Sequence, residues 1–174
     1  KGQDTLIRAM DKVRRSVPDV CCLLVGDTSP SDQEYGQSLH MLVDSLGLDK
    51  QIVFAGFQRN VGDFLMMCDV MVHASVLPEP FGRVILEAMA CKKPVIGSHA
   101  GAIPEIVVEG ETGLTFPPGD SDSLADAIIR LISDRELMGR CGENGYKRLV
   151  HDFHIAQNIE ATQGLYERML GAAA

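Results

Sequence analysis

Apolar residues recur along the chain in two alternating patterns. At the start they follow helical spacing, and the helix that this predicts ends near Pro18. An unbroken apolar run at 20–25 comes next and is closed by Gly26, which is typical of a strand in a sheet covered on both faces. The apolar positions of the first helix are Leu6, Ile7, Met10 and Val13.

This alternation of helix and strand continues to the end of the chain. The spacing predicts further strands at about 52–55, 70–73, 94–97 and 112–116. It predicts further helices at about 31–46, 61–67, 82–90, 103–108, 121–133, 136–150 and 155–170. We therefore expect an α/β fold with a doubly wound, Rossmann-like parallel sheet. Residues 1–174 are expected to form one domain with C-terminal helices at about 151–174.

Loops at the carboxyl ends of the strands are the expected binding region, because ligands of open parallel sheets bind there. Four such loops are rich in glycine, proline and small polar residues. They lie at 26–31, 56–60, 74–82 and 98–104. Asp120 follows a stiff Pro-Pro-Gly turn and is placed to cap the next helix.

Composition excludes several classes of protein. The formal net charge of −8 argues against a general nucleic-acid binder, which needs a basic face. No apolar run approaches the ~20 residues that cross a bilayer, and no signal peptide opens the chain.

The histidines are scattered, and each is expected to be structural or solvated. Cys21, Cys22 and Cys68 lie in apolar runs, so we expect buried thiols in a reducing cytoplasm, with no metal site.

The segment 79–87 carries the strongest chemical signal. Glu79 lies between two prolines, so it belongs to a loop, and a helix begins near Phe81 or Gly82. The first N–H groups of that helix form an anion site, and Arg83 adds a cation. Glu87 lies roughly 7–8 Å further along the helix. Two carboxylates around an anion site fit a diphosphate with sugar hydroxyls on both sides, as in a sugar nucleotide.

A simpler interpretation of the same residues has to be weighed. Arg83 and Glu87 are four residues apart on a helix and could form an ordinary surface ion pair, worth about 0.3–0.5 kcal/mol. Glu79 could be a solvated loop charge.

Four ordered blocks resemble the group 1 (family 4) glycosyltransferases. Residues 75–90 resemble their E-x7-E motif, and the likeness continues through 92–98, 101–107 and 111–120. The resemblance implies the C-terminal, nucleotide-sugar-binding half of the GT-B fold. It implies retaining transfer of a hexosyl group, without a bound metal, to an acceptor held by an N-terminal domain that this chain lacks.

The resemblance also implies roles for individual residues. Glu79 is the implied catalytic residue, in contact with the transferred sugar, and Glu87 contacts the ribose. Backbone amides around Phe81, Gly82 and Arg83 hold the diphosphate. Lys1 resembles the lysine of an R-x4-K phosphate motif, whose arginine would precede the chain, so the chain is expected to be an excised piece. The base is expected near Gly26, Asp27, Phe57 and Arg59.

The resemblance also implies which molecules the protein binds, and two other functions remain open. The nucleoside-diphosphate sugar is a substrate, no cofactor is expected, and the isolated fragment is expected to bind a nucleoside diphosphate weakly without transferring sugar. No transmembrane segment is expected; peripheral membrane contact through the absent domain stays open. Lys92 and Ala102 depart from glycines common in the family, so the donor sugar is not assigned. The alternatives are a nucleotide-sugar epimerase of the same fold and a non-catalytic nucleotide-binding module, for which Asp27 ends a strand.

Overall fold

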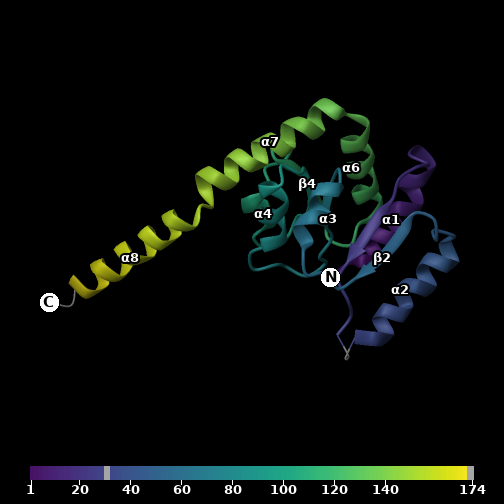
Figure 1. Ribbon diagram of the computed structural model, residues 1–174, viewed down its shortest axis with the longest axis horizontal. Coiled ribbons are helices and arrows are strands. Elements are labelled where there is room, and N and C mark those ends of the chain that lie inside the picture. The colour runs from purple at the N-terminus through teal and green to yellow at the C-terminus, as the bar shows by residue number, and fades with distance from the viewer. Residues whose placement is uncertain (30–31, 172–174) are drawn as a thin grey trace.

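The computed structural model describes residues 1–29 and 32–171, and every predicted element is found there in the predicted order (Figure 1). The strands are β1 (Cys22–Val25), β2 (Ile52–Gly56), β3 (Met71–His73), β4 (Val95–Ser98) and β5 (Gly113–Phe116). The helices are α1 (Gln3–Ser16), α2 (Gln33–Leu46), α3 (Val61–Met67), α4 (Arg83–Ala90), α5 (Ile103–Ile106), α6 (Ser121–Ser133), α7 (Arg135–Asp152) and α8 (Ile155–Gly171). The end of the loop predicted at 26–31 lies outside the described residues.

All strand pairs are parallel, as the sequence predicts, but they do not form one continuous hydrogen-bonded sheet. Among the described residues, β1 pairs with β2, and β3, β4 and β5 form a separate sheet of three strands. Residues of β1 and β3 line a common cleft instead of pairing with each other.

Two apolar layers cover the two faces of the three-stranded sheet. Side chains of a strand alternate between faces, so the neighbours Val95 and Ile96 of β4 point to opposite sides. Val95 packs in a cluster with Ile85 of α4 and Ile103 of α5, whereas Ile96 belongs to the larger cluster around α1 and α6. This arrangement confirms helices on both faces of a parallel sheet.

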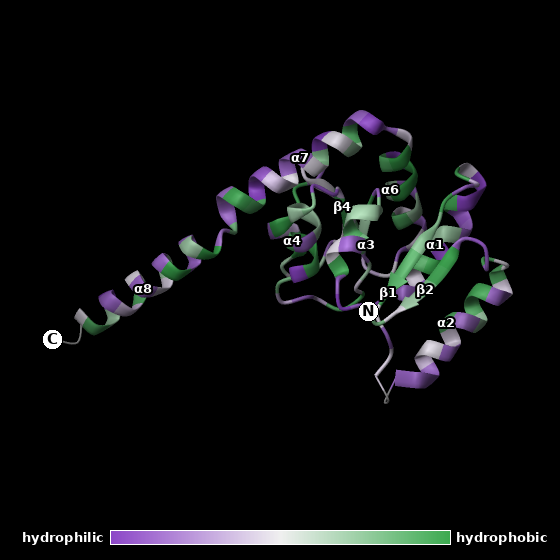
Figure 2. Cartoon of the chain, in the orientation of Figure 1, coloured by the Kyte–Doolittle hydropathy of each residue, from purple (hydrophilic) through white to green (hydrophobic). Residues whose placement is uncertain are grey.

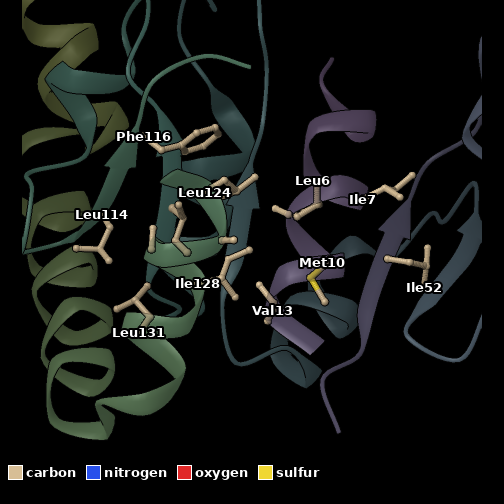
Figure 3. Packing of buried hydrophobic residues seen from close by; sticks show 14 of the residues in the cluster. Leu6, Ile7, Met10, Val13, Ile52, Leu114, Phe116, Leu124, Ile128 and Leu131 are labelled. Atoms are coloured by element: carbon tan, nitrogen blue, oxygen red, sulfur yellow. The ribbon is translucent and has the colours of Figure 1, made fainter. Parts of the chain in front are cut away.

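Helices α1 and α6 pack closely against each other in the larger core. Figure 3 shows Leu6 and Val13 of α1 facing Leu124 and Ile128 of α6, all buried. The helical spacing of apolar residues in the first 16 positions places these side chains on the face of α1 that packs against α6. Burial of one such side chain stabilises the fold by roughly 1.5–3 kcal/mol.

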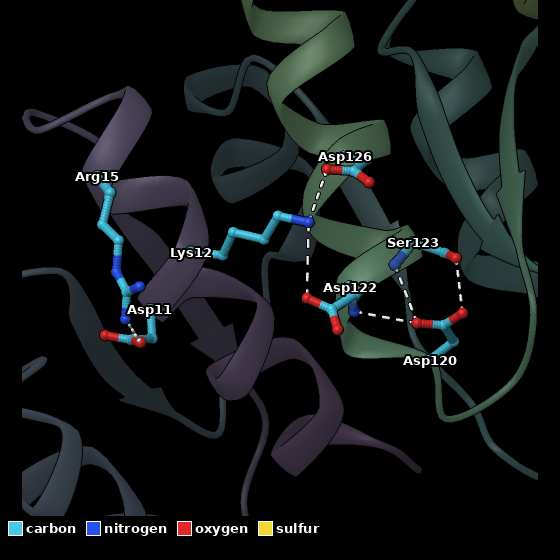
Figure 4. A network of polar contacts seen from close by, with 7 residues as sticks. All are labelled: Asp11, Lys12, Arg15, Asp120, Asp122, Ser123 and Asp126. Atoms are coloured by element: carbon cyan, nitrogen blue, oxygen red, sulfur yellow. Dashed lines mark hydrogen bonds and ion pairs between the residues drawn. The ribbon is translucent and has the colours of Figure 1, made fainter.

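Polar contacts border the same helix pair. Figure 4 shows Lys12 of α1 between Asp122 and Asp126 of α6, with Nζ–Oδ1 distances of 3.5 and 2.9 Å. Asp120 caps α6 as predicted: its Oδ1 accepts hydrogen bonds of 3.0 Å from the amides of Asp122 and Ser123. The cap fixes where α6 begins and thereby orients its apolar face toward α1.

Helix α8 extends away from the rest of the molecule (Figure 1). None of its residues is buried, and hydrophobic and hydrophilic positions alternate around it (Figure 2). Its large exposed hydrophobic residues are Ile155, Ile159, Leu165, Tyr166, Met169 and Leu170. No helix among the described residues is long and apolar enough to cross a membrane.

The expectation of buried thiols at three cysteines is wrong in part. Cys21 is exposed, and Cys22 and Cys68 are only partly covered. The reason is that β1 and β3 border the open cleft, so the apolar run at 20–25 is not covered on both faces. Cys141 of α7 is the buried cysteine, and all five are free thiols.

Candidate functional site

A cleft of about 1680 Å³ runs between β1 and β3 and reaches the loops at their carboxyl ends. Most of the residues that the sequence singles out line it. They are Lys1, Gly26, Asp27, Glu79, Phe81, Gly82, Arg83 and Glu87. Phe57 and Arg59 are not among its lining residues; they lie in the exposed turn between β2 and α3.

The backbone of Glu79 is held by the loop that follows β4. Glu79 and Gly101 form an isolated parallel bridge, and the Ala102 amide donates a 3.0 Å hydrogen bond to the Glu79 carbonyl. Gly101 has a φ of 59°, and a Cβ at this position would lie 2.3 Å from the Glu79 carbonyl oxygen. Glycine is therefore required here both for its conformation and for the close approach of the two loops.

The two loops are also joined where they leave the sheet. Ser98 at the end of β4 donates a buried 2.6 Å hydrogen bond from Oγ to the carbonyl of Ser75. Both serines are buried. The bond ties the start of the segment that carries Glu79 to the neighbouring strand.

The Glu79 side chain is paired and largely covered, with 17% of it exposed. Its Oε1 accepts a hydrogen bond from Lys1 Nζ, and His73 Nε2 lies 3.8 Å from the same oxygen. The hydrogen bond from Lys1 is the main reason why the pKa of Glu79 lies below its usual value, against a smaller opposing effect of burial. Glu79 is thus an ionised residue of the cleft, and the interpretation as a solvated loop charge is wrong.

Lys1 reaches Glu79 because the start of α1 lies against the end of β3. Gly2 has a φ of 82°, and a Cβ there would lie 1.9 Å from the Ala74 carbonyl oxygen. Only glycine allows this approach. The Lys1 side chain itself is 69% exposed, so no packing holds its ammonium in the pair with Glu79.

The first turn of α4 provides the anion site that the sequence predicts. Gly82 precedes the helix with a φ of 81°, and no side chain caps this end. A Cβ on Gly82 would lie 2.8 Å from Cδ1 of Ile103, so the missing side chain also lets the helix start sit against α5. Exposed N–H groups at such a helix start attract anions.

Arg83 and Glu87 both face the cleft and are both exposed. Within the described residues no ion pair or hydrogen bond joins them, although they are one helical turn apart. The interpretation as a surface ion pair is therefore wrong. Both side chains are available to a ligand.

His73 also lines the cleft, which the sequence does not predict, because the scattered histidines indicate only structural or solvated residues. It ends β3, is 8% exposed and lines the cleft, and its Nδ1 is buried without a hydrogen-bond partner. Burial is the main cause that lowers its pKa, with the nearby Glu79 carboxylate opposing and Lys1 assisting. The available signal was its position at a strand end, just before the loop with Glu79.

No group of three or more His, Cys, Asp and Glu side chains that could hold a metal occurs in the described part of the chain. Asp120 and Asp122 have an Asp-x-Asp spacing that occurs in metal sites. Asp120 caps α6, and Asp122 pairs with Lys12. Asp27, which the binding-module alternative required, is exposed and accepts a 2.8 Å hydrogen bond from the Thr28 amide.

Comparison with known proteins shows the family to which the chain belongs. The family model "Glycosyl transferases group 1" matches residues 1–148. The chain belongs to the group 1 glycosyltransferase family. The N-acetyl-alpha-D-glucosaminyl L-malate synthase of Bacillus anthracis is 35% identical over 170 residues, which cover 98% of this chain and 43% of that relative.

Two solved structures, one of them from the group 1 glycosyltransferase family, have the same fold. Anabaena HepE in complex with UDP-glucose has a TM-score of 0.89 at 35% identity, covering 96% of this chain and 45% of that one. The C-terminal domain of LpcC from Francisella tularensis has a TM-score of 0.82 at 36% identity, covering 89% and 80%. The fold is thus that of the C-terminal half of a GT-B glycosyltransferase. This chain spans less than half the length of the synthase and of HepE.

Proposed function

We propose that this chain is the donor-binding half of a retaining hexosyltransferase that uses a nucleoside-diphosphate sugar. The observation that carries the proposal is the order of groups along one cleft: Glu79, then the open start of α4 with Arg83, then Glu87. The UDP-glucose complex of the similar HepE supports a ligand of this class. The family match favours transfer over the epimerase alternative.

Each part of the donor has a matching group in this arrangement. The α4 start, Arg83 and Lys1 bind the diphosphate through amides and cations. Glu79 accepts hydrogen bonds from the transferred sugar, and Glu87 accepts them from the ribose. The base binds nearest to the loop of Gly26 and Asp27, which lines the cleft, and not to Phe57 and Arg59, which do not line it.

The chemistry follows from where negative charge develops. When the bond between the sugar C1 and the phosphate oxygen breaks, its electron pair leaves with the nucleoside diphosphate. Preorganised amides at a helix start and nearby cations stabilise that charge. These groups can take the place of a divalent metal, so we propose that transfer is metal-independent.

The acceptor is proposed to bind to an N-terminal half of the same polypeptide. The relatives are about twice as long as this chain, and α8 presents exposed apolar side chains such as Ile159 and Met169 that a further domain could cover. The 174-residue chain alone then binds donor without transferring sugar. A cytoplasmic location is also proposed, supported by five free thiols.

Activity of the intact polypeptide tests this proposal. Incubation with UDP-, GDP- and ADP-sugars and an acceptor library is expected to yield a glycoside, with the anomeric configuration of the donor retained in the product by NMR. A product of inverted configuration refutes the retaining mechanism. Release of a free epimerised sugar in place of a glycoside supports the epimerase alternative.

A further inference from the structure

Two nitrogen groups converge on one oxygen of Glu79. Lys1 Nζ donates a hydrogen bond to Oε1, and His73 Nε2 faces the same atom at 3.8 Å. That second distance is about 0.8 Å longer than an ordinary N–H···O hydrogen bond. His73 is thus next to the carboxylate but does not yet bind it.

The two groups differ in how firmly they are held. The Lys1 side chain is 69% exposed, whereas only 9% of the His73 side chain is exposed at the end of β3. The lysine can therefore leave the carboxylate without loss of packing, and the histidine cannot. If Lys1 turns to the diphosphate of a donor, His73 is the nitrogen group that stays beside Glu79.

The surroundings of the imidazole favour one protonation state. Nδ1 is buried without a partner, and Nε2 faces a carboxylate oxygen. A proton on Nε2 gives Glu79 a donor, whereas a proton on Nδ1 would be buried without an acceptor. Burial, which is the largest effect, and Lys1 lower the pKa of His73, while Glu79 and the histidine's own backbone raise it. The net lowering keeps the ring neutral at pH 7.

We propose that His73 is a positioning residue. When Lys1 moves to the donor diphosphate, His73 replaces it as the hydrogen-bond donor to Oε1 of Glu79. The neutral ring donates from Nε2–H and holds the carboxylate in place. Oε2 is then free to accept a hydrogen bond from a hydroxyl of the transferred sugar. The role assigned to Glu79 within this inference rests on the proposed function, whereas the exchange between Lys1 and His73 can be tested without any ligand.

The ligand-free test uses the 174-residue chain with ¹⁵N-labelled histidine. We expect NMR of the wild type at pH 7 to show a neutral His73 with the proton on Nε2. In Lys1→Met, which removes the side-chain ammonium and leaves the α-ammonium in place, the Nε2–H resonance is expected to move downfield as the ring binds Glu79. This shift is expected to vanish in Lys1→Met/Glu79→Gln. A proton on Nδ1, or a Lys1→Met spectrum equal to the wild type, overturns the proposal.

The ligand test compares two substitutions of similar size. His73→Gln keeps an N–H donor at about the reach of Nε2, and His73→Leu removes it. For UDP-glucose and UDP, or GDP-mannose and GDP if the base is guanine, the ratio of sugar-nucleotide affinity to diphosphate affinity is expected to fall about tenfold in His73→Leu. His73→Gln is expected to restore most of it.

A merely structural role gives a different result. It lowers the melting temperature of His73→Leu and weakens the diphosphate and the sugar nucleotide equally, which contradicts the positioning role. If the wild-type chain binds no nucleotide at all, the donor-binding proposal fails for this chain. The ligand-free NMR result then decides on its own whether His73 replaces Lys1 at Glu79.

Discussion

Gly101 and Glu79 lie backbone to backbone, so that a Cβ on the glycine would be 2.3 Å from the Glu79 carbonyl oxygen and 2.7 Å from its amide nitrogen. The loop after β4 therefore fixes the loop after β3. The position of the Glu79 carboxylate depends on a residue that has no side chain and is not among those lining the cleft.

Gly101→Ala is expected to damage both stability and donor binding. The added methyl group must displace the Glu79 backbone, and a left-handed φ of 59° adds about 1 kcal/mol of strain. We expect a total loss of about 2 kcal/mol or more in the free energy of unfolding, measured with urea, and a clear loss of sugar-nucleotide affinity.

Gly110→Ala is the matched control. Gly110 also has a left-handed φ, 74°, but a Cβ there would meet nothing within 4 Å. It is expected to lose only about 1 kcal/mol and to bind nucleotide sugars normally. Equal effects of the two substitutions would show that the contact with Glu79 is unimportant.

Glu87→Gln is expected to remove recognition of the ribose. The wild-type chain should bind a ribonucleoside diphosphate about tenfold more tightly than its 2′,3′-dideoxy analogue, because a carboxylate accepts strong hydrogen bonds from hydroxyls. The variant should bind the two nearly equally, as isothermal titration calorimetry can measure. A variant that keeps the wild-type preference would place the ribose elsewhere.

The ion pair of Glu79 predicts a pH dependence of stability. Lys1 lowers the pKa of Glu79 below its reference value of 4.5, so the stabilisation is complete above pH 4.5 and is lost as the pH falls through the lower, folded-state pKa. The stability advantage of wild type over Glu79→Gln should therefore be larger at pH 7 than at pH 3. Urea unfolding at several pH values measures it, and a constant difference would contradict the pairing.

Metal removal is expected to leave transfer unchanged. Charge on the leaving diphosphate is stabilised by the α4 start, Arg83 and Lys1 in this account, so EDTA should not lower the turnover of the intact enzyme. A loss of activity that added Mg²⁺ or Mn²⁺ restores would show that a metal takes part.

Much of the fold could be predicted because the local signals agree with the tertiary structure. The helix at Ser121–Ser133 was predicted to the residue, since Asp120 caps it and its apolar face packs on α1. The separation of β1 from β3 could not be predicted. Apolar runs predict where strands lie along the chain, but not which strand edges form hydrogen bonds with each other. The exposure of Cys21 follows from that separation and was missed with it.

The site could be predicted less completely than the fold. Glu79, Gly82 and Arg83 lie within five consecutive residues of the sequence, and their chemistry follows from one helix start. His73 and Gly101 act through contacts with Glu79 that are formed between different strand ends. Spacing along the chain carries no information about such contacts.

We expect the cleft to bind the two parts of a sugar nucleotide at different groups, the sugar at Glu79 and the diphosphate at the α4 start. Calorimetric titration of wild type and Glu79→Ala with UDP, GDP and ADP and with the matching nucleotide sugars tests it most directly. We expect one base to bind to the wild-type chain, and Glu79→Ala to keep the diphosphate affinity while losing at least tenfold in affinity for the nucleotide sugar. No binding by any of these ligands at millimolar concentration, or equal losses for both ligand types, would contradict the claim.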